Sequence, residues 1–104
     1  MSKGNRTLLV VEDDPGLQKA LRWAFTDFEV VTAEDRKSAV SQLRRHEPQV
    51  VTLDLGLPPD PGSAREGLAI LEEILGLAPD IKVIVVTGND DHANAAVSYT
   101  HLRA

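Results

Sequence analysis

The sequence contains no cysteine, so neither disulfide bonds nor thiolate metal ligands can contribute to its structure or chemistry. Long hydrophobic runs are also missing: the longest apolar stretches hold about five residues, whereas a membrane-spanning helix needs ~20. Basic residues are outnumbered, with 11 Lys and Arg against 16 Asp and Glu, and the net charge of -5 argues against nucleic acid as a direct partner. The opening residues MSKGNRT lack the apolar core of a signal peptide. We therefore expect a cytoplasmic protein that neither crosses a membrane nor contacts nucleic acid through this segment.

The 104 residues that are present suffice for one small domain, and their 42% hydrophobic content is that of a folded chain. Short apolar runs rich in β-branched residues alternate with segments of helical periodicity. Strands are predicted over Thr7–Val11, Glu29–Ala33, Val50–Leu53 and Lys82–Val86, and helices over 15–26, 34–46, from 63 or 67 to 77, and from about 92 to the end of the chain. Strands and helices in strict alternation predict an α/β fold with a parallel sheet and right-handed crossovers.

Acidic residues gather at the ends of these predicted strands. Glu12, Asp13 and Asp14 follow the first strand, and Asp54 follows the third. In open parallel sheets, functional residues collect at the carboxyl ends of the strands. If the first and third strands are neighbours, several carboxylates crowd together, and two unit charges ~4 Å apart repel by about 4 kcal/mol at an effective dielectric near 20. A cation relieves this repulsion, and ligands made only of oxygen favour Mg²⁺ over zinc.

A metal at this position would bring a phosphoryl group to Asp54, whose carboxylate can itself act as a nucleophile toward phosphorus. Thr87 ends the fourth predicted strand and places a hydroxyl where it could bond a phosphoryl oxygen. Three stretches carry this pattern: LLVVEDDPGL, VVTLDLGLPP and VIVVTGND. Together they resemble the strand-end motifs of the receiver domain of two-component response regulators, over Thr7 to about Val97.

The resemblance implies a flavodoxin-like, doubly wound sheet with strand order 2-1-3-4 and a role as phosphoacceptor rather than enzyme. Mg²⁺ would be held by Glu12, Asp13, Asp54 and the backbone carbonyl of Gly56, with Asp13 the direct ligand of the acidic pair. Asp54 would be phosphorylated by a histidine kinase, and Thr87 would be the switch hydroxyl. The resemblance also implies a domain that assists its own phosphorylation and dephosphorylation, regulates transcription through an output domain absent from this chain, and forms a homodimer when complete.

Two departures from the family pattern stand out. The loop after Pro58 carries PDPGSARE where the family has a short turn. Together with EDRKSAV and TGNDD, this loop resembles the receivers of transcription regulators associated with PEP-CTERM exopolysaccharide systems. The family also places a lysine at the end of a fifth strand to bind the phosphoryl group. This chain shows no such lysine, because Lys3, Lys19, Lys37 and Lys82 lie elsewhere in the predicted fold.

The last eight residues, VSYTHLRA, match one reading frame of the transposon-end adapter used in sequencing libraries. We therefore expect residues 1–97 to be an incomplete receiver domain that ends within the fourth helix, without the fifth strand and helix of the family. Residues 98–104 are expected to be a non-native tail.

Two other functions remain open. A pseudo-receiver would bind partners without phosphorylation, and the missing lysine leaves that alternative open. An aspartate-nucleophile phosphatase of the haloacid dehalogenase type needs a second aspartate two residues after the nucleophile, where this chain has Gly56.

Overall fold

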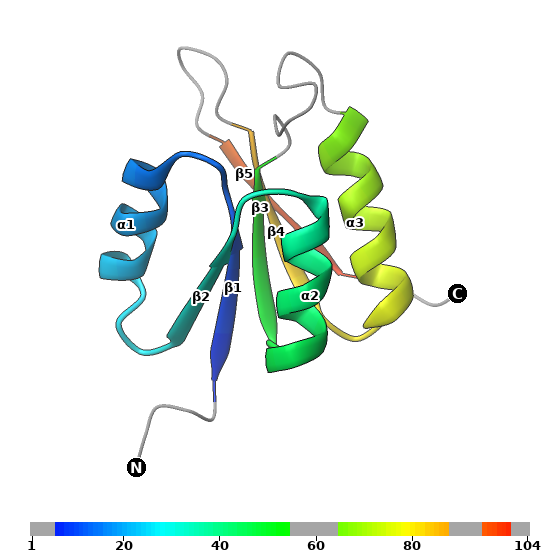
Figure 1. The fold of residues 1–104 in the computed structure, drawn as a ribbon, viewed down its shortest axis with the longest axis horizontal. Helices are drawn as coiled ribbons and strands as arrows, with labels where there is room; N and C mark the ends of the chain where they lie inside the picture. The colour runs from blue at the N-terminus through cyan, green and yellow to red at the C-terminus, as the bar shows by residue number, and fades with distance from the viewer. Residues whose placement is uncertain (1–5, 55–64, 88–94, 101–104) are drawn as a thin grey trace.

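A five-stranded sheet forms the centre of the computed structural model, which describes residues 6–54, 65–87 and 95–100 (Figure 1). In chain order the elements are β1 (Thr7–Val11), α1 (Pro15–Ala24), β2 (Glu29–Ala33), α2 (Arg36–His46), β3 (Val50–Asp54), α3 (Arg65–Leu77), β4 (Lys82–Thr87) and β5 (Ala95–Thr100). The strand order is β2-β1-β3-β4-β5, in which the first four strands run parallel and β5 runs antiparallel to β4. The predicted α/β fold with parallel order 2-1-3-4 is confirmed.

The main hydrophobic core lies between the sheet and the helices α2 and α3, which stand side by side in Figure 1. Alternate residues of each strand face these helices, as the pleat of a strand requires. Helix α2 contributes Ala39 and Leu43 to this core, and α3 contributes Ile70, Leu71 and Ile74. Val40 on α2 is half-buried, and Leu68 on α3 is 49% exposed.

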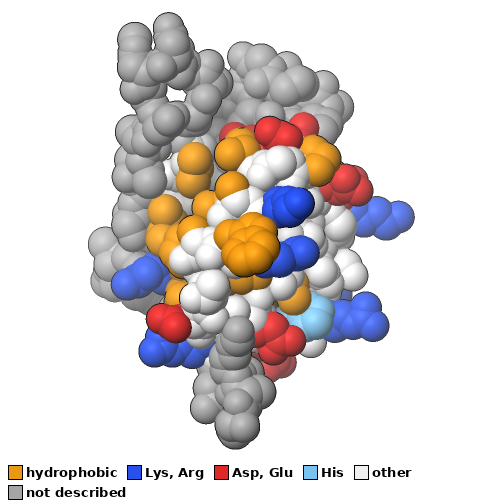
Figure 2. Space-filling view, turned by 90° about the vertical axis from the view of Figure 1, so that its left-hand side faces the viewer, with side chains coloured by type: hydrophobic (Ala, Val, Ile, Leu, Met, Phe, Trp, Pro, Cys, Tyr) orange, Lys and Arg blue, Asp and Glu red, His pale blue; other side chains and the backbone are white. Residues whose placement is uncertain are grey.

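The described residues cover the opposite face of the sheet less completely. The chain moves from β1 to β2 in one direction and from β2 to β3 in the other, so right-handed crossovers place α1 on the face away from α2. Helix α1 buries none of its own residues, and its Trp23 is 72% exposed. Figure 2 looks onto the α1 side and shows hydrophobic side chains gathered among cationic ones. On this face of the sheet Leu8 and Val10 are buried, whereas Ile84 and Val86 are only half-buried.

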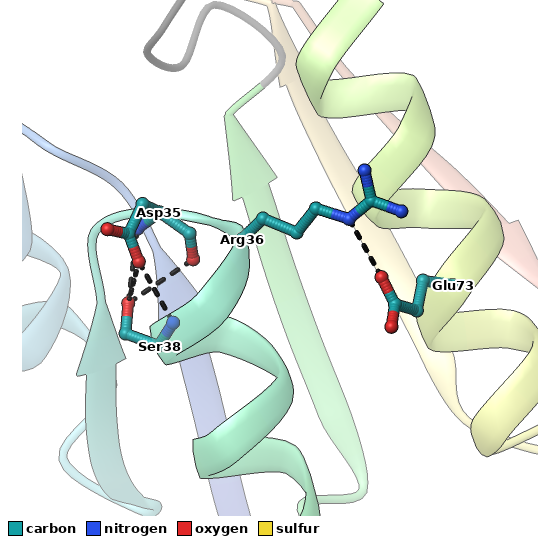
Figure 3. A network of polar contacts seen from close by, with 4 residues as sticks. All are labelled: Asp35, Arg36, Ser38 and Glu73. Carbon is teal, nitrogen blue, oxygen red and sulfur yellow. Dashed lines mark hydrogen bonds and ion pairs between the residues drawn. The ribbon is translucent and has the colours of Figure 1, made fainter.

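Polar contacts define the start of α2 and join it to α3 (Figure 3). The Asp35 carboxylate accepts a hydrogen bond from the Ser38 backbone N–H at 2.9 Å, and the Ser38 hydroxyl accepts one from the Asp35 backbone N–H at 3.1 Å. This reciprocal pair is a capping box, which satisfies donors that the first helical turn leaves open. One residue further on, the Arg36 guanidinium donates to the Glu73 carboxylate at 2.8 Å and links the two helices at their exposed sides.

The prediction of a fourth helix is wrong for residues 95–100, the part of that segment that the structure describes. Ala95–Thr100 forms β5 and pairs with β4 along its whole length, from Thr87↔Ala95 to Lys82↔Thr100. The expectation that no strand follows β4 is therefore also wrong, because β5 pairs with β4 in the antiparallel direction. The physical reason is the open edge of β4, whose backbone groups need partners that an extended segment supplies.

Candidate functional site

The sheet register places Glu12 beside Asp54. Val11 is the partner of Leu53 in the parallel pair β1–β3, so the next residue of each strand, Glu12 and Asp54, comes to the same carboxyl edge of the sheet. The Glu12 backbone N–H donates to the Ala33 carbonyl at 2.9 Å and so extends the pairing of β1 with β2. This edge is where open parallel sheets hold their ligands.

Glu12, Asp13 and Asp54 each bring one carboxylate oxygen within 4.8 Å of the other two. Among the described residues they form a group with the spacing and the hard oxygen donors that suit a magnesium ion. The predicted clustering of these three acids is therefore confirmed, and its fit to the Mg²⁺ site of receiver domains is good. Asp13 is exposed, Asp54 half-buried, and Glu12 only 6% exposed.

The electrostatics of the cluster show the cost of placing these charges together. Burial, followed by the nearby charges of Asp54 and Asp13, raises the pKa of Glu12 from an ordinary value of 4.5 to about 7. The Asp14 backbone N–H, which donates to Glu12 Oε2 at 3.1 Å, opposes this rise but does not cancel it. A cation between the three carboxylates would reverse the balance and favour ionised Glu12.

The start of α1 supports the acidic group from one side. Asp14 caps the helix by accepting from the Gly16 backbone N–H at 3.0 Å. Gln18 lies one helical turn further and donates from Nε2 to the backbone carbonyl of Glu12. Sequence reasoning missed Gln18, although its position four residues after the N-cap would have placed it over the strand end. It positions the backbone from which Glu12 projects.

The other predicted site residues are placed only in part. Thr87 ends β4 one residue beyond Val86, the partner of Asp54, so its backbone lies at the same edge of the sheet. Gly56 falls outside the described residues.

No lysine of the described chain reaches this edge from β4. Lys82 starts that strand in register with Val50, four residues before Val86. At about 3.3 Å per residue that distance is roughly 13 Å along the strand, so Lys82 lies at the far end of the sheet from Asp54. This placement agrees with the sequence interpretation that Lys82 cannot replace the missing lysine.

None of the helices in the described residues has the length and apolar character needed to cross a membrane.

Comparisons with known proteins agree with this geometry. The sequence pattern of the response regulator receiver domain matches residues 8–102. TcrX of Mycobacterium tuberculosis, a probable transcriptional regulatory protein, is 34% identical over 86 residues, which cover 81% of this chain and 35% of TcrX. This chain therefore spans about a third of the length of that relative.

Solved structures show the same fold. A CheY-like receiver domain protein from Methanospirillum hungatei superposes with a TM-score of 0.71 at 25% identity, covering 82% of this chain and 66% of that one. A crystal structure of the histidine kinase ThkA in complex with the response regulator protein TrrA also matches, with a TM-score of 0.70 at 26% identity. That match covers 86% of this chain and 74% of the other.

Proposed function

Because the chain belongs to the receiver domain family of two-component response regulators, we propose that Asp54 accepts a phosphoryl group from a histidine kinase in a Mg²⁺-dependent reaction. The observation that carries this proposal is the approach of Glu12, Asp13 and Asp54 to within 4.8 Å at the carboxyl edge of β1 and β3. Receiver domains are typically phosphoacceptors rather than enzymes, and a cytoplasmic location is part of the proposal.

The residues of the chain have separate roles in this reaction. A carboxylate oxygen of Asp54 attacks phosphorus, the O–P bond forms, and the P–N bond of the donor phosphohistidine breaks as its electron pair returns to the imidazole. Mg²⁺, when bound, would neutralise charge on the transferring group. Asp13, Glu12 and the Gly56 carbonyl would hold the ion beside Asp54, and the Thr87 hydroxyl would bond a phosphoryl oxygen after transfer.

The first prediction concerns Asp54 itself. Incubation with Mg²⁺ and acetyl phosphate should add one phosphoryl group to the wild-type chain and none to Asp54→Asn, because the amide is not a nucleophile toward phosphorus. Intact-mass spectrometry measures the adduct, and EDTA should prevent it in the wild type. Glu66→Gln, an acid substitution on α3 outside the acidic cluster, is the matched control and should still be phosphorylated. Phosphorylation of Asp54→Asn to the wild-type extent would contradict the assignment.

A pseudo-receiver is the second candidate, because no lysine of the described residues reaches the Asp54 edge of the sheet from β4. A preorganised cation of this kind typically contributes about 2.7–4 kcal/mol to stabilising developing charge. The same incubation separates the candidates. A lasting adduct on Asp54 supports the phosphoacceptor, no adduct despite Mg²⁺ binding supports the pseudo-receiver, and turnover of acetyl phosphate without an adduct supports a phosphatase.

The wider biological setting is also part of the proposal. The name of TcrX as a probable transcriptional regulatory protein supports a role in transcription through an output domain outside these 104 residues. The sequence PDPGSARE, of which the structure describes only Arg65 and Glu66 at the start of α3, supports a link to PEP-CTERM systems, and neighbouring genes for exopolysaccharide synthesis would test that link.

A further inference from the structure

Helix α2 carries an unusual concentration of positive charge for so acidic a chain. Its sequence, RKSAVSQLRRH, holds 4 of the 11 Lys and Arg residues and no Asp or Glu. The remainder of the chain therefore has seven cations against its 16 acids. This contrast divides the molecule into one basic helix and an acidic remainder.

Three of the cations share one side of the helix. Lys37, Arg44 and Arg45 line a shallow, open depression of about 560 Å³ together with Val40 and Ser41. These positions follow the spacing i, i+3, i+4, i+7 and i+8, which places them on one helical face. Val40 is half-buried at the middle of this surface, and the other four side chains are exposed around it. We call these five residues the α2 basic face.

Helix capping explains only part of this charge. Arg44 and Arg45 lie in the last turn, where the helix dipole favours cations. Lys37 lies in the first turn, where the dipole disfavours a cation, and that turn holds no acid. Arg36, the other cation of the first turn, points to α3 and is paired with Glu73, as Figure 3 shows. Within the described chain no salt bridge engages Lys37, Arg44 or Arg45.

We propose that the α2 basic face binds an acidic segment of a partner protein, in the form of a short helix with carboxylates along one side. The half-buried Val40 provides an apolar seat, and the cations around it would pair with carboxylates. Helix α2 is about 16 Å long, so a partner segment of similar length covers it without reaching the acidic remainder of the chain.

Other anionic partners fit this surface less well. A nucleic acid would extend beyond α2 and meet a surface of net negative charge, which repels phosphates. A membrane surface would need large apolar side chains to insert, and the exposed ones among the described residues are Leu17, Trp23, Leu68 and Leu77, none of which lies on α2. An acidic protein segment needs neither a long basic surface nor an insertion anchor.

The test uses the 104-residue chain in the cold at low salt, with far-UV circular dichroism to show that it is folded. The probe is an acidic helical peptide of about 11 residues, matching α2 in length, with Glu along one side and a central Leu. A peptide with Gln in place of Glu is the matched ligand control. Lys37→Gln/Arg44→Gln removes two cations from the basic face, and Lys19→Gln/Arg22→Gln removes two from α1 as the matched protein control.

We expect the acidic peptide to bind the wild type and the α1 variant equally, and the α2 variant about five-fold more weakly. The Gln peptide should not bind. The proposal would be overturned if both variants lost the same affinity for the acidic peptide, or if the Glu and Gln peptides bound equally well. A second outcome would also overturn it: the wild type binds duplex DNA or phosphatidylglycerol vesicles, the α2 variant alone binds them more weakly, and the acidic peptide does not bind. The α2 basic face would then recognise another class of partner.

A second measurement needs no variant and covers the case in which the α2 variant does not fold. The acidic peptide should protect Lys37 from acetylation by a soluble acetylating reagent, as measured by mass spectrometry. Lys19 and Lys82, which lie on other elements, should react at unchanged rates. Equal protection of all three lysines, or of none, would count against the α2 basic face.

Discussion

Burial sets the behaviour of Glu12, because its side chain is the most enclosed of the three clustered carboxylates. Its raised pKa means that the folded chain holds a proton on Glu12 at pH values where the unfolded chain has released it. The stabilising contribution is therefore complete below about pH 4.5 and is lost as the pH rises through about 7. A shift of this size corresponds to about 3 kcal/mol of unfolding free energy.

We predict that Glu12→Gln loses less stability than the wild type between pH 5 and pH 8, on the order of 3 kcal/mol less, because Gln does not titrate. Urea unfolding at both pH values in EDTA measures this difference. Mg²⁺ should restore wild-type stability at the higher pH and should act more weakly on the variant. Equal pH dependence of the two proteins would show that Glu12 does not carry the effect.

A second residue of interest lies in the middle of β3. Thr52 is 4% exposed, and its hydroxyl oxygen has no hydrogen-bond partner among the described residues. Its neighbours in the sheet register are Val10 and Ile84, which are apolar. A buried hydroxyl without a partner costs stability that an apolar group of the same shape does not.

We predict that Thr52→Val raises the unfolding free energy by about 1 kcal/mol, since valine keeps the shape and the β-branch of threonine. Thr32→Val is the matched control, because Thr32 lies in the same row of the sheet but is half-buried. Its effect should be smaller. A Thr52→Val variant that is less stable than the wild type would mean that the hydroxyl has a partner.

At the scale of elements, local sequence decided most of the fold. The buried runs Thr7–Val11 and Val50–Leu53 are continuous and β-branched, so they predicted strands of a doubly covered parallel sheet. Because the parallel register follows from the crossovers, the meeting of Glu12, Asp13 and Asp54 could also be predicted. Ala95–Thr100 could not be, since its extended form depends on a non-local partner, the edge of β4.

The capping box of α2 gives a prediction at this scale. Asp35→Ala should lower the unfolding free energy by about 1 kcal/mol, because the first turn loses the acceptor for the Ser38 backbone N–H. The Ser38 hydroxyl bond lowers the pKa of Asp35, so the contribution of the wild-type charge is present near neutral pH and is lost as the pH falls. Asp35→Asn keeps a capping oxygen and should lose less at pH 7. Equal losses would assign the effect to charge rather than to capping.

At the scale of the whole molecule, the two faces of the sheet are unequal. Among the described residues, one face packs against two helices and holds the main core, while the other is covered by α1 alone, which buries none of its own residues. Val50, Ile84 and Val86 remain half-buried on that side, although burying one such side chain fully contributes ~1.5–3 kcal/mol. Leaving several such side chains half-buried forgoes free energy comparable with the ~5–15 kcal/mol that stabilises a whole domain.

The last prediction follows from this inequality: the 104-residue chain should unfold well below ~50 °C or aggregate, and should bind a dye that reports exposed apolar surface. Thermal unfolding followed by circular dichroism, together with dye fluorescence, measures both properties. The matched comparison is a chain that replaces residues 98–104 with the genomic continuation after Val97, which should be more stable if those residues are the non-native tail that we propose. A cooperative transition of the 104-residue chain above ~50 °C would contradict the stability prediction. Genomic DNA that encodes Ser98 to Ala104 unchanged would separately contradict the proposed non-native tail. The incomplete burial on the α1 face would then be a property of the native sequence.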